Sequence, residues 1–340
     1  MNAPWFLLVS ASLVVSWVMT LLVIRFSSRL RLIQYANQRS SHLMPTPSGG
    51  GIGIVVGAMV GGGSSVWGGD GHLLGFLYLA LPLALLGLWD DVCHLQVTLR
   101  LIIQTLLILG LMTLQGLFGE ADFGSIAWSL LILLLGVWWI NLFNFMDGID
   151  GLAAVQAVFM LLAGSGLVIL ADPNLLDSQF ILFCACLIAA TLGFLALNWS
   201  PAKIFMGDTG SLWLAFMIFA LALYSIHNGW LSSVAWLILA AVFVVDASTT
   251  LVTRCLRGER WHEAHRSHAY QRFSRMLQQG GNEGHRMVST MVTGINLFFL
   301  FPLAWVSLRW PQWSILCVIA AYVPLTFCAI SLGAGRSDNA

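Results

Sequence analysis

The chain of 340 residues contains eleven apolar runs, each about 18–22 residues long. A helix needs about 20 apolar residues to cross a bilayer, so we expect each run to be a membrane-spanning helix. The sequence therefore predicts an all-α polytopic membrane protein, with one integral-membrane domain over residues 1–340. The predicted spans are 4–24, 50–68, 72–89, 99–118, 124–142, 152–171, 179–197, 209–226, 231–252, 288–307 and 312–333.

The composition supports the same fold class. Charged residues make up 9% of the chain, against roughly 25% in soluble domains. The formal net charge is zero, so nothing indicates nucleic-acid binding. The six cysteines are scattered and show neither a disulfide framework nor zinc-finger spacing. The first run is too long for the core of a signal peptide and lacks a cleavage site, so we expect it to be retained.

The basic residues predict the orientation of the chain. With the N-terminus outside, every lysine and arginine except Arg309 falls in a segment on the inner side. Lys and Arg concentrate in cytoplasmic loops, so we expect a periplasmic N-terminus and a cytoplasmic C-terminus. The two longest cytoplasmic loops would be residues 25–49 and 253–287.

The acidic residues then divide into two groups. Those in the outer loops are interpreted as solvated loop residues. Those near the inner ends of spans place the polar chemistry at the cytoplasmic membrane edge, whereas transporters commonly bind near the bilayer midplane. The inner group is Asp90, Asp91, Asp147, Asp150, Asp208 and Asp246.

The segment from Asn141 to Ala153 has the strongest functional pattern. Asn141, Asn144, Asp147 and Asp150 recur every third residue, which places them near one face if the segment is helical. Such a face offers hard oxygen ligands for Mg²⁺ and a site for a phosphorylated substrate. The alternative is a polar helix end with turns formed by glycine.

Asp90 and Asp91 form a second motif at the inner end of the third span. Adjacent carboxylates can bind a divalent cation, and one can accept a proton from a substrate. An ordinary acidic helix terminus explains the pair equally well.

The segment from Asn198 to Ser211 is the third motif. Its small residues precede the eighth span, where exposed backbone N–H groups favour phosphate. Asp208 would supply a hard metal ligand and Lys203 would reach a phosphate. The alternative is that Asp208 caps the helix.

The late cytoplasmic loop is the fourth motif. His265, Arg266 and His268 suit a diphosphate better than zinc, because no cysteine partner is present. Binding of lipid headgroups is the alternative, which we favour for His262 and His285. Asp246 would either pair with Arg254 or line the site. In the first loop, Arg39 and His42 would hold a phosphate or anchor the loop to the membrane.

Together these motifs resemble the polyprenyl-phosphate N-acetylhexosamine-1-phosphate transferases of glycosyltransferase family 4. The superfamily includes enzymes that initiate O-antigen and teichoic acid synthesis, and the phospho-MurNAc-pentapeptide transferase of peptidoglycan synthesis. The resemblance covers residues 39 to about 286. The runs Asn37–Pro47 and His265–Gln271 most resemble the Pseudomonas-type O-antigen initiating branch.

The resemblance implies a reaction and roles for the motif residues. Undecaprenyl phosphate would attack the β-phosphate of a UDP-N-acetylamino sugar of the GlcNAc, FucNAc or QuiNAc type, and UMP would leave. It implies that Asn144 and Asp208 bind Mg²⁺, with Mn²⁺ as a substitute, and that Asp90 or Asp91 activates the lipid phosphate. It further implies that Asp147 and Asp150 lie on the nucleotide side. The residues expected to bind substrate are Asn198, Lys203, His265, Arg266, His268 and His42.

This sequence departs from the family pattern at one place. Many relatives carry a His-x-His-His cluster where this chain has His268-Ala269-Tyr270-Gln271, so only the first histidine is kept. The family also implies a homodimer and contact with membrane lipids. The competing functions are a transporter and a non-catalytic scaffold. A transporter predicts charges near the bilayer midplane and internal repeats, which the sequence does not show, and a scaffold gives the three acidic motifs no purpose.

Overall fold

A computed structural model of the chain describes residues 3–34, 45–93, 95–119, 122–259, 265–279 and 283–336. Within these ranges the protein is helical apart from one two-stranded antiparallel pair. The elements are α1 Ala3–Phe26, β1 Ile33–Gln34, β2 Thr46–Pro47, α2 Gly51–Val66, α3 Gly71–Cys93, α4 Val97–Leu114, α5 Phe123–Phe145, α6 Leu152–Ala171, η1 Pro173–Asp177, α7 Gln179–Asn198, α8 Gly207–His227, α9 Ser233–Leu239, α10 Ala241–Leu256, α11 Ala269–Gln279, α12 Gly284–Ile295, η2 Asn296–Leu300, α13 Phe301–Arg309, η3 Pro311–Trp313 and α14 Ser314–Ser331.

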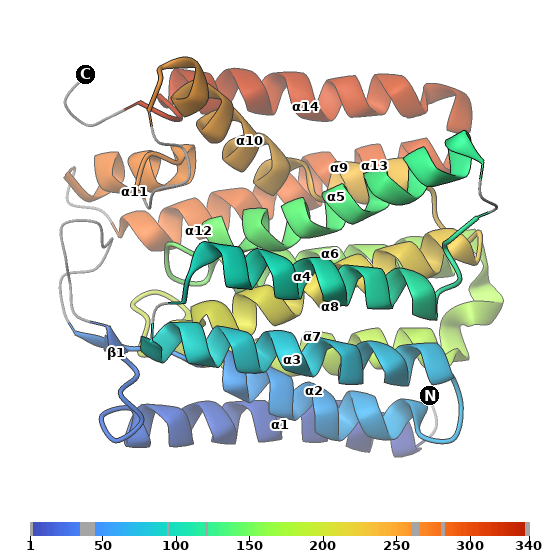
Figure 1. Cartoon of the computed structure of the whole chain (residues 1–340), viewed down its shortest axis with the longest axis horizontal. Helices are drawn as coiled ribbons and strands as arrows, with labels where there is room; N and C mark the ends of the chain where they lie inside the picture. The colour runs from blue at the N-terminus through green and yellow to red at the C-terminus, as the bar shows by residue number, and fades with distance from the viewer. Residues whose placement is uncertain are drawn as a thin grey trace.

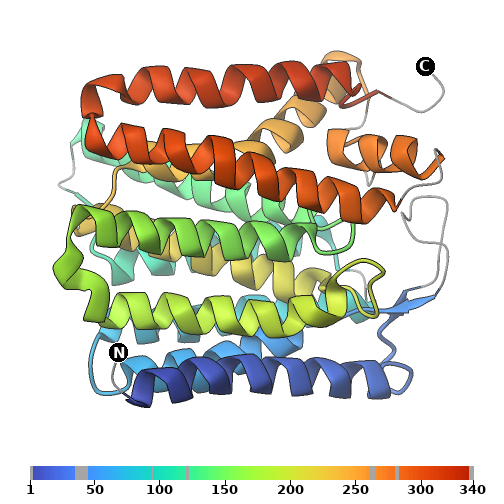
Figure 2. The ribbon, with the colours of Figure 1, turned by 180° about the vertical axis from the view of Figure 1, so that it is seen from behind.

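The long helices run side by side along one direction, and the ends of the described chain lie at opposite ends of the bundle (Figures 1 and 2). α6, α7 and α8 have mostly buried faces, whereas α1 and α14 expose many apolar side chains. An apolar outer surface is what a helix bundle presents to lipid. An odd number of crossings is required to place the two ends on opposite sides.

The number of spans differs from the predicted eleven. Over the described residues, nine helices are long and apolar enough to cross a membrane, and α9 with α10 makes a tenth if the bent pair counts as one span. The predicted second span corresponds to α2, which has only 16 residues. At 1.5 Å per residue it is about 24 Å long, less than the roughly 30 Å hydrocarbon core.

α2 nevertheless connects the two ends of the bundle. At its start, the Gly51 N–H donates to the Met206 carbonyl at 2.9 Å. Near its far end, the Gln179 amide approaches the Ser65 carbonyl at 3.5 Å.

One face of α2 is built from glycines that meet small residues of α1. The pairs are Gly53 with Thr20, Gly57 with Ser16, and Gly61 with Ser12. Small residues at a helix interface let two backbones approach closely. For this reason α2 packs tightly between α1 and α7.

A break after Leu239 bends α9 against α10 by 71°. The break leaves the Leu239 carbonyl without a helical partner, and the Gln156 side chain of α6 donates to it at 3.0 Å. Asn296 in the π-helical turn η2 donates to Gln156 Oε1 at 2.7 Å. Both amide side chains are fully buried. A polar network inside the bundle therefore supplies the hydrogen bond that the Leu239 carbonyl loses at the bend.

Candidate functional site

Three helix ends meet at one end of the bundle. α3 carries Asp90 and Asp91 in its last turn, α5 carries Asn144 in its last turn, and α8 carries Asp208 in its first turn. Asp91 accepts the Asp208 N–H at 3.0 Å and the Thr209 hydroxyl at 3.1 Å. Asp91 therefore caps the N-terminus of α8, where a negative charge is favourable. The expected alternative, that Asp208 caps its own helix, is wrong because its side chain makes no capping bond.

Glycines bring α3 and α8 into backbone contact at this point. A Cβ atom on Gly87 of α3 would lie 2.4 Å from the carbonyl carbon of Asp208 and from the Thr209 nitrogen. Gly207 has a φ of +72°, a conformation that side chains rarely adopt. The Asp208 backbone is thus held against α3 by two positions that only glycine fits.

Asp208 is the centre of the polar contacts. Its Oδ1 accepts from the Asn144 amide at 2.8 Å, and Arg100 of α4 lies 3.2 Å from its Oδ2. The Asn144 amide also donates to the Ser211 hydroxyl at 2.9 Å. Arg100 forms a second, close ion pair with the buried Asp90. Four helices therefore contribute to one polar cluster.

Asp147 follows α5 in a turn and is half-buried. Burial raises its pKa well above the ordinary value, and the charges of Asp208 and Asp91 raise it further. Asp90 and Asp208 contact the guanidinium of Arg100, and Asp91 and Asp147 lie near Asp208. A bound cation would favour the ionised form of these carboxylates. The helical face predicted for residues 141–150 is wrong beyond Phe145, because α5 ends there and Gly151 has a φ of +75°.

Asn141 lies outside this cluster. It donates to Gln104 of α4 at 2.7 Å and to the Val137 carbonyl at 2.8 Å. It therefore joins two helices, as expected of a structural residue.

Asp150 and Asn198 join neighbouring loops. Asp150 lies 3.1 Å from His285 Nδ1 and accepts the Ala202 N–H at 3.1 Å. Burial disfavours its ionised form, but hydrogen bonding and the charge of His285 outweigh burial and lower the pKa of Asp150. Asn198 accepts from Gly151 at 3.0 Å and donates to the Ile204 carbonyl at 2.8 Å. Both side chains are buried and bonded to protein groups, and their expected contacts with substrate stay predictions. The headgroup role favoured for His285 is wrong, because its side chain is buried against Asp150.

The late loop lies beside the turn that follows α5. The Tyr270 hydroxyl donates to the Phe145 carbonyl at 2.9 Å, and the His268 ring lies 6.3 Å from the Phe145 ring. Burial, with the nearby His268 and Arg254, lowers the pKa of His265 to about 3. A neutral imidazole can still donate or accept a hydrogen bond, so the diphosphate role expected for His265 stays a prediction. The Arg266 carbonyl accepts from Arg275 at 2.9 Å.

Lys203 is exposed and lies in the loop before α8. The end of the first loop is fastened to the same place, since the Phe205 N–H donates to the Pro47 carbonyl at 2.8 Å. Arg39, His42 and His262 lie outside the described residues.

Sequence reasoning missed Arg100. It is the only lysine or arginine between Arg39 and Lys203, and it stands ten positions after Asp90. An isolated basic residue at the end of a predicted span, shortly after an acidic pair, could have indicated this role for Arg100.

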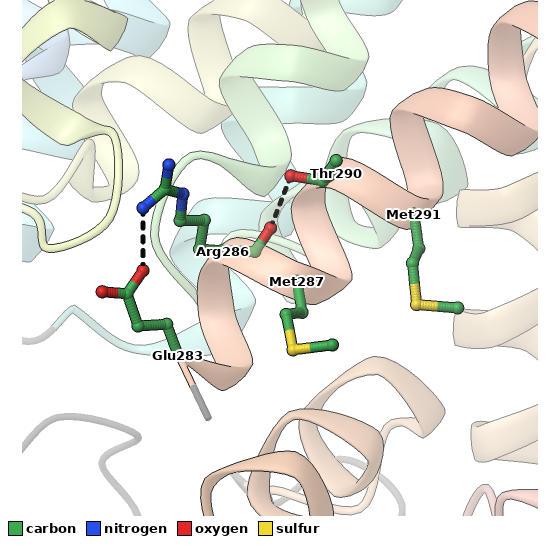
Figure 3. Close-up of a pocket in the computed structure, with 5 residues that line it drawn as sticks. All are labelled: Glu283, Arg286, Met287, Thr290 and Met291. Atoms are coloured by element: carbon green, nitrogen blue, oxygen red, sulfur yellow. Dashed lines mark hydrogen bonds and ion pairs between the residues drawn. The ribbon is translucent and has the colours of Figure 1, made fainter. Parts of the chain in front are cut away.

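Another hollow lies away from the carboxylates, on the outer face of α12 (Figure 3). Arg286 and Glu283 form an exposed ion pair there at 3.0 Å, and Met287 and Met291 lie beside it. No residue of the carboxylate cluster lines this hollow, so we do not assign it to the functional site.

The carboxylate cluster lies in a region of the chain that is similar to a known protein family. Residues 73–226 match the model for Glycosyl transferase family 4, and this range contains Asp90, Asp91, Arg100, Asn144, Asp147 and Asp208.

Three similar proteins illustrate the relationship. A probable undecaprenyl-phosphate N-acetylglucosaminyl 1-phosphate transferase of Bacillus subtilis is 29% identical over 77% of this chain and 75% of its own length. A phospho-N-acetylmuramoyl-pentapeptide-transferase of Limosilactobacillus fermentum is 28% identical over 61% of this chain and 67% of its own. One from Nostoc punctiforme is 42% identical over 33% and 28%. From residue 73 to residue 226, where the carboxylate cluster lies, this membrane protein carries the sequence pattern of Glycosyl transferase family 4.

Proposed function

We propose that the protein transfers an N-acetylhexosamine 1-phosphate group from a UDP-sugar to undecaprenyl phosphate. The observation that carries the proposal is the convergence of Asp90, Asp91, Asn144, Asp147 and Asp208 within the region that matches the family. Phosphoryl transfer depends on positioning and on neutralising charge more than on covalent chemistry. A carboxylate cluster with one arginine provides groups for both tasks.

We propose Mg²⁺ as the cofactor, with Mn²⁺ as a substitute. Among the described residues, no three His, Cys, Asp or Glu side chains form a ready metal cluster. Mg²⁺ usually takes only one or two carboxylates and completes its shell with water and substrate phosphates, so such a cluster is not required. Asp208 and Asn144 lie 2.8 Å apart, and a flip of the Asn144 amide would present its oxygen. The donor chemistry fits, and a bound cation would neutralise phosphate charge.

The contacts suggest separate tasks for the acidic residues. Both oxygens of Asp91 bind the N-terminal turn of α8, and Asp90 is paired with Arg100, so these residues position Asp208 and the arginine. The Asp147 carboxylate makes no hydrogen bond within the described part of the chain. We therefore propose that Asp147 contacts substrate, and that the reaction is a single displacement by the lipid phosphate.

An apolar cavity suits the lipid substrate. It has a volume of about 260 Å³ and lies between α5, α6, α8 and the bent pair α9 and α10. Leu142 lines it, and Asn144 of the same helix belongs to the carboxylate cluster. A polyprenyl chain in this cavity would lie along α5, the helix that carries Asn144.

We further propose that the chain crosses the bacterial inner membrane eleven times. Counting α2 and the bent pair as spans gives an odd number, in keeping with ends of the chain at opposite ends of the bundle. Lys203, Arg254 and Arg266 lie at the same end of the bundle as the carboxylates, which is also the end at which the described chain finishes. The positive-inside rule therefore favours a cytoplasmic site.

The donor we propose is UDP-GlcNAc or a 6-deoxy relative of the FucNAc or QuiNAc type, which would initiate O-antigen or another envelope polysaccharide. The Bacillus subtilis relative carries N-acetylglucosaminyl in its name. A second candidate is UDP-MurNAc-pentapeptide, because phospho-N-acetylmuramoyl-pentapeptide-transferases match a shorter region at higher identity.

The test is UMP release by the purified chain in detergent, with undecaprenyl phosphate and each UDP-sugar in turn. We expect release that depends on Mg²⁺ and is lost in Asp208→Asn. Asp122→Asn is the matched control, because Asp122 only caps α5. Full activity in Asp208→Asn would contradict the metal assignment, and release from UDP-MurNAc-pentapeptide alone would favour the second candidate. A labelled sugar phosphate trapped on the enzyme without lipid would overturn the single displacement.

A further inference from the structure

Asp246 is a buried carboxylate that the proposed chemistry does not use. It lies in α10, beyond the bend, and is 6% exposed. Its oxygens accept the backbone N–H groups of Ala269 at 3.0 Å and Tyr270 at 2.8 Å. They also face Thr250 Oγ1 and His268 Nδ1, each at 3.2 Å.

Two of these contacts hold the start of α11. The first N–H groups of a helix have no partner inside the helix and carry partial positive charge, so a carboxylate there is favourable. Here the carboxylate comes from a different helix, α10, rather than from the residue before α11. Asp246 therefore fastens the cytoplasmic helix α11 to the bundle. Arg254, one of the partners expected for Asp246, pairs with Glu259 at 2.7 Å.

The His268 contact has a chemical consequence. The two nitrogens of an imidazole are distinct, and the partner of one determines what the other can do. With Nδ1 directed at Asp246, Nδ1 carries the proton and Nε2 remains for another partner. The ring lies beside Phe145, the last residue of α5 and one residue after Asn144.

Tyr270 completes the connection. Its N–H binds Asp246 and its hydroxyl binds the Phe145 carbonyl, which joins α10, α11 and the end of α5. The buried Tyr270 also lies against Gly148, where an added Cβ would be 2.1 Å from its hydroxyl. A shift of Asp246 would therefore move both His268 and the turn that carries Asp147.

We propose that Asp246 is a positioning residue for His268: it sets the tautomer and the place of the imidazole that binds the diphosphate of the UDP-sugar. This inference rests on the proposed function. The alternative is a purely structural role, in which Asp246 only caps α11. Only the positioning role predicts that the effect of Asp246 on substrate binding depends on His268.

The kinetic test is a double-mutant cycle with Asp246→Asn, His268→Gln and the double variant in the full chain. We expect Asp246→Asn to raise the KM for UDP-sugar on the order of tenfold, the usual scale for a carboxylate that orients a functional histidine, with kcat little changed. The double variant should be no worse than His268→Gln alone. Additive effects, or a fall in kcat alone, would overturn the inference.

Thr250→Val is the matched control. It removes a contact to the same carboxylate oxygen but leaves α11 and His268 in place, so its KM should equal that of the wild type. A KM raised as much as in Asp246→Asn would show that any loss of contact to Asp246 suffices, and would overturn the specific role. If Asp246→Asn fails to fold, Asp246→Glu keeps the charge and is expected to raise KM less than His268→Gln.

Hydrogen exchange tests the anchoring without any activity. In Asp246→Asn the amides of residues 268–272 should exchange at least about tenfold faster, and in Thr250→Val they should not change. Unchanged exchange in Asp246→Asn would overturn the anchoring. A wild-type chain that releases no UMP, yet shows this exchange pattern, would refute the proposed function and leave the anchoring of α11 standing.

Discussion

Replacing Gly87 with alanine is expected to separate α3 from α8 at the carboxylate cluster. The new Cβ would lie 2.4 Å from backbone atoms of Asp208 and Thr209, whereas ordinary contacts are 3.4–4 Å. The shortfall is about 1 Å, and backbone atoms cannot rotate away as a side chain can. Asp208 must therefore move by about this distance relative to Asp90 and Asp91.

The expected effect on activity exceeds the effect on stability. A misplacement of about 1 Å costs roughly 100-fold in rate when reacting groups need alignment. Overpacking of this kind costs roughly 1–3 kcal/mol in free energy of unfolding. UMP release by Gly87→Ala, measured at saturating UDP-sugar and undecaprenyl phosphate, should fall about 100-fold while the protein stays folded in detergent.

Two alanine variants serve as controls for Gly87→Ala. A Cβ added to Gly294 would meet no described atom within 4 Å, so Gly294→Ala should behave as wild type. A Cβ on Gly136 would meet the movable side chains of Phe219 and Ile108, away from the cluster, so Gly136→Ala reports on overpacking alone. Activity of Gly87→Ala above half that of wild type would refute the reasoning, as would an equal loss in Gly136→Ala.

Three further outcomes are expected. Lys203→Ala should raise the KM for UDP-sugar by about tenfold at most, without a change in thermal stability, because the side chain is exposed and makes no hydrogen bond or ion pair with described residues; a loss confined to kcat would contradict this. His285→Asn should change how stability depends on pH. In the wild type the pKa of Asp150 lies below its ordinary 3.8, so this stabilisation is present above about pH 4 and is lost as pH falls through the folded pKa. In His285→Asn the pKa of Asp150 should rise, because less opposes the effect of burial. The melting temperature of this variant, measured between about pH 3 and 7, should therefore not show the fall at low pH that the wild type shows. Gln156→Leu should lower the free energy of unfolding by about 1–3 kcal/mol, because the Leu239 carbonyl and the Asn296 amide lose their partner; an unchanged melting temperature would show that the bend does not need this network.

Most of the spans and the grouping of the main acidic residues were predictable because both are extreme features of the sequence. Apolar runs need no partner to be recognised, and carboxylates beside them have few reasons to be there. Asp90, Asp91, Asn144, Asp147 and Asp208 lie together for this reason, and the structure adds Arg100 to the set.

The tasks of the individual polar residues were not predictable, because they depend on contacts distant in the sequence. Asp150 lies 135 positions before its partner His285. Asp246 binds the N-terminus of α11, and no sequence pattern near Asp246 predicts this contact. Asn198 carries the same amide as Asn144, yet both its oxygen and its nitrogen bind backbone groups. Residue type alone does not distinguish a ligand-binding side chain from a structural one.

The glycine-rich helix α2 has a consequence for how the protein is made. It is short for a bilayer, and most of its packing is against α1 and α7. The ribosome produces α1 just before it, but α7 emerges only after α3, α4, α5 and α6. We therefore expect α2 to stay loosely placed during synthesis and to settle when α7 arrives, so chains truncated before Gln179 should leave α2 open to protease. Since the start of α2 is hydrogen-bonded to the loop before Asp208, the order of synthesis delays completion of the site until the helices around it are in the membrane.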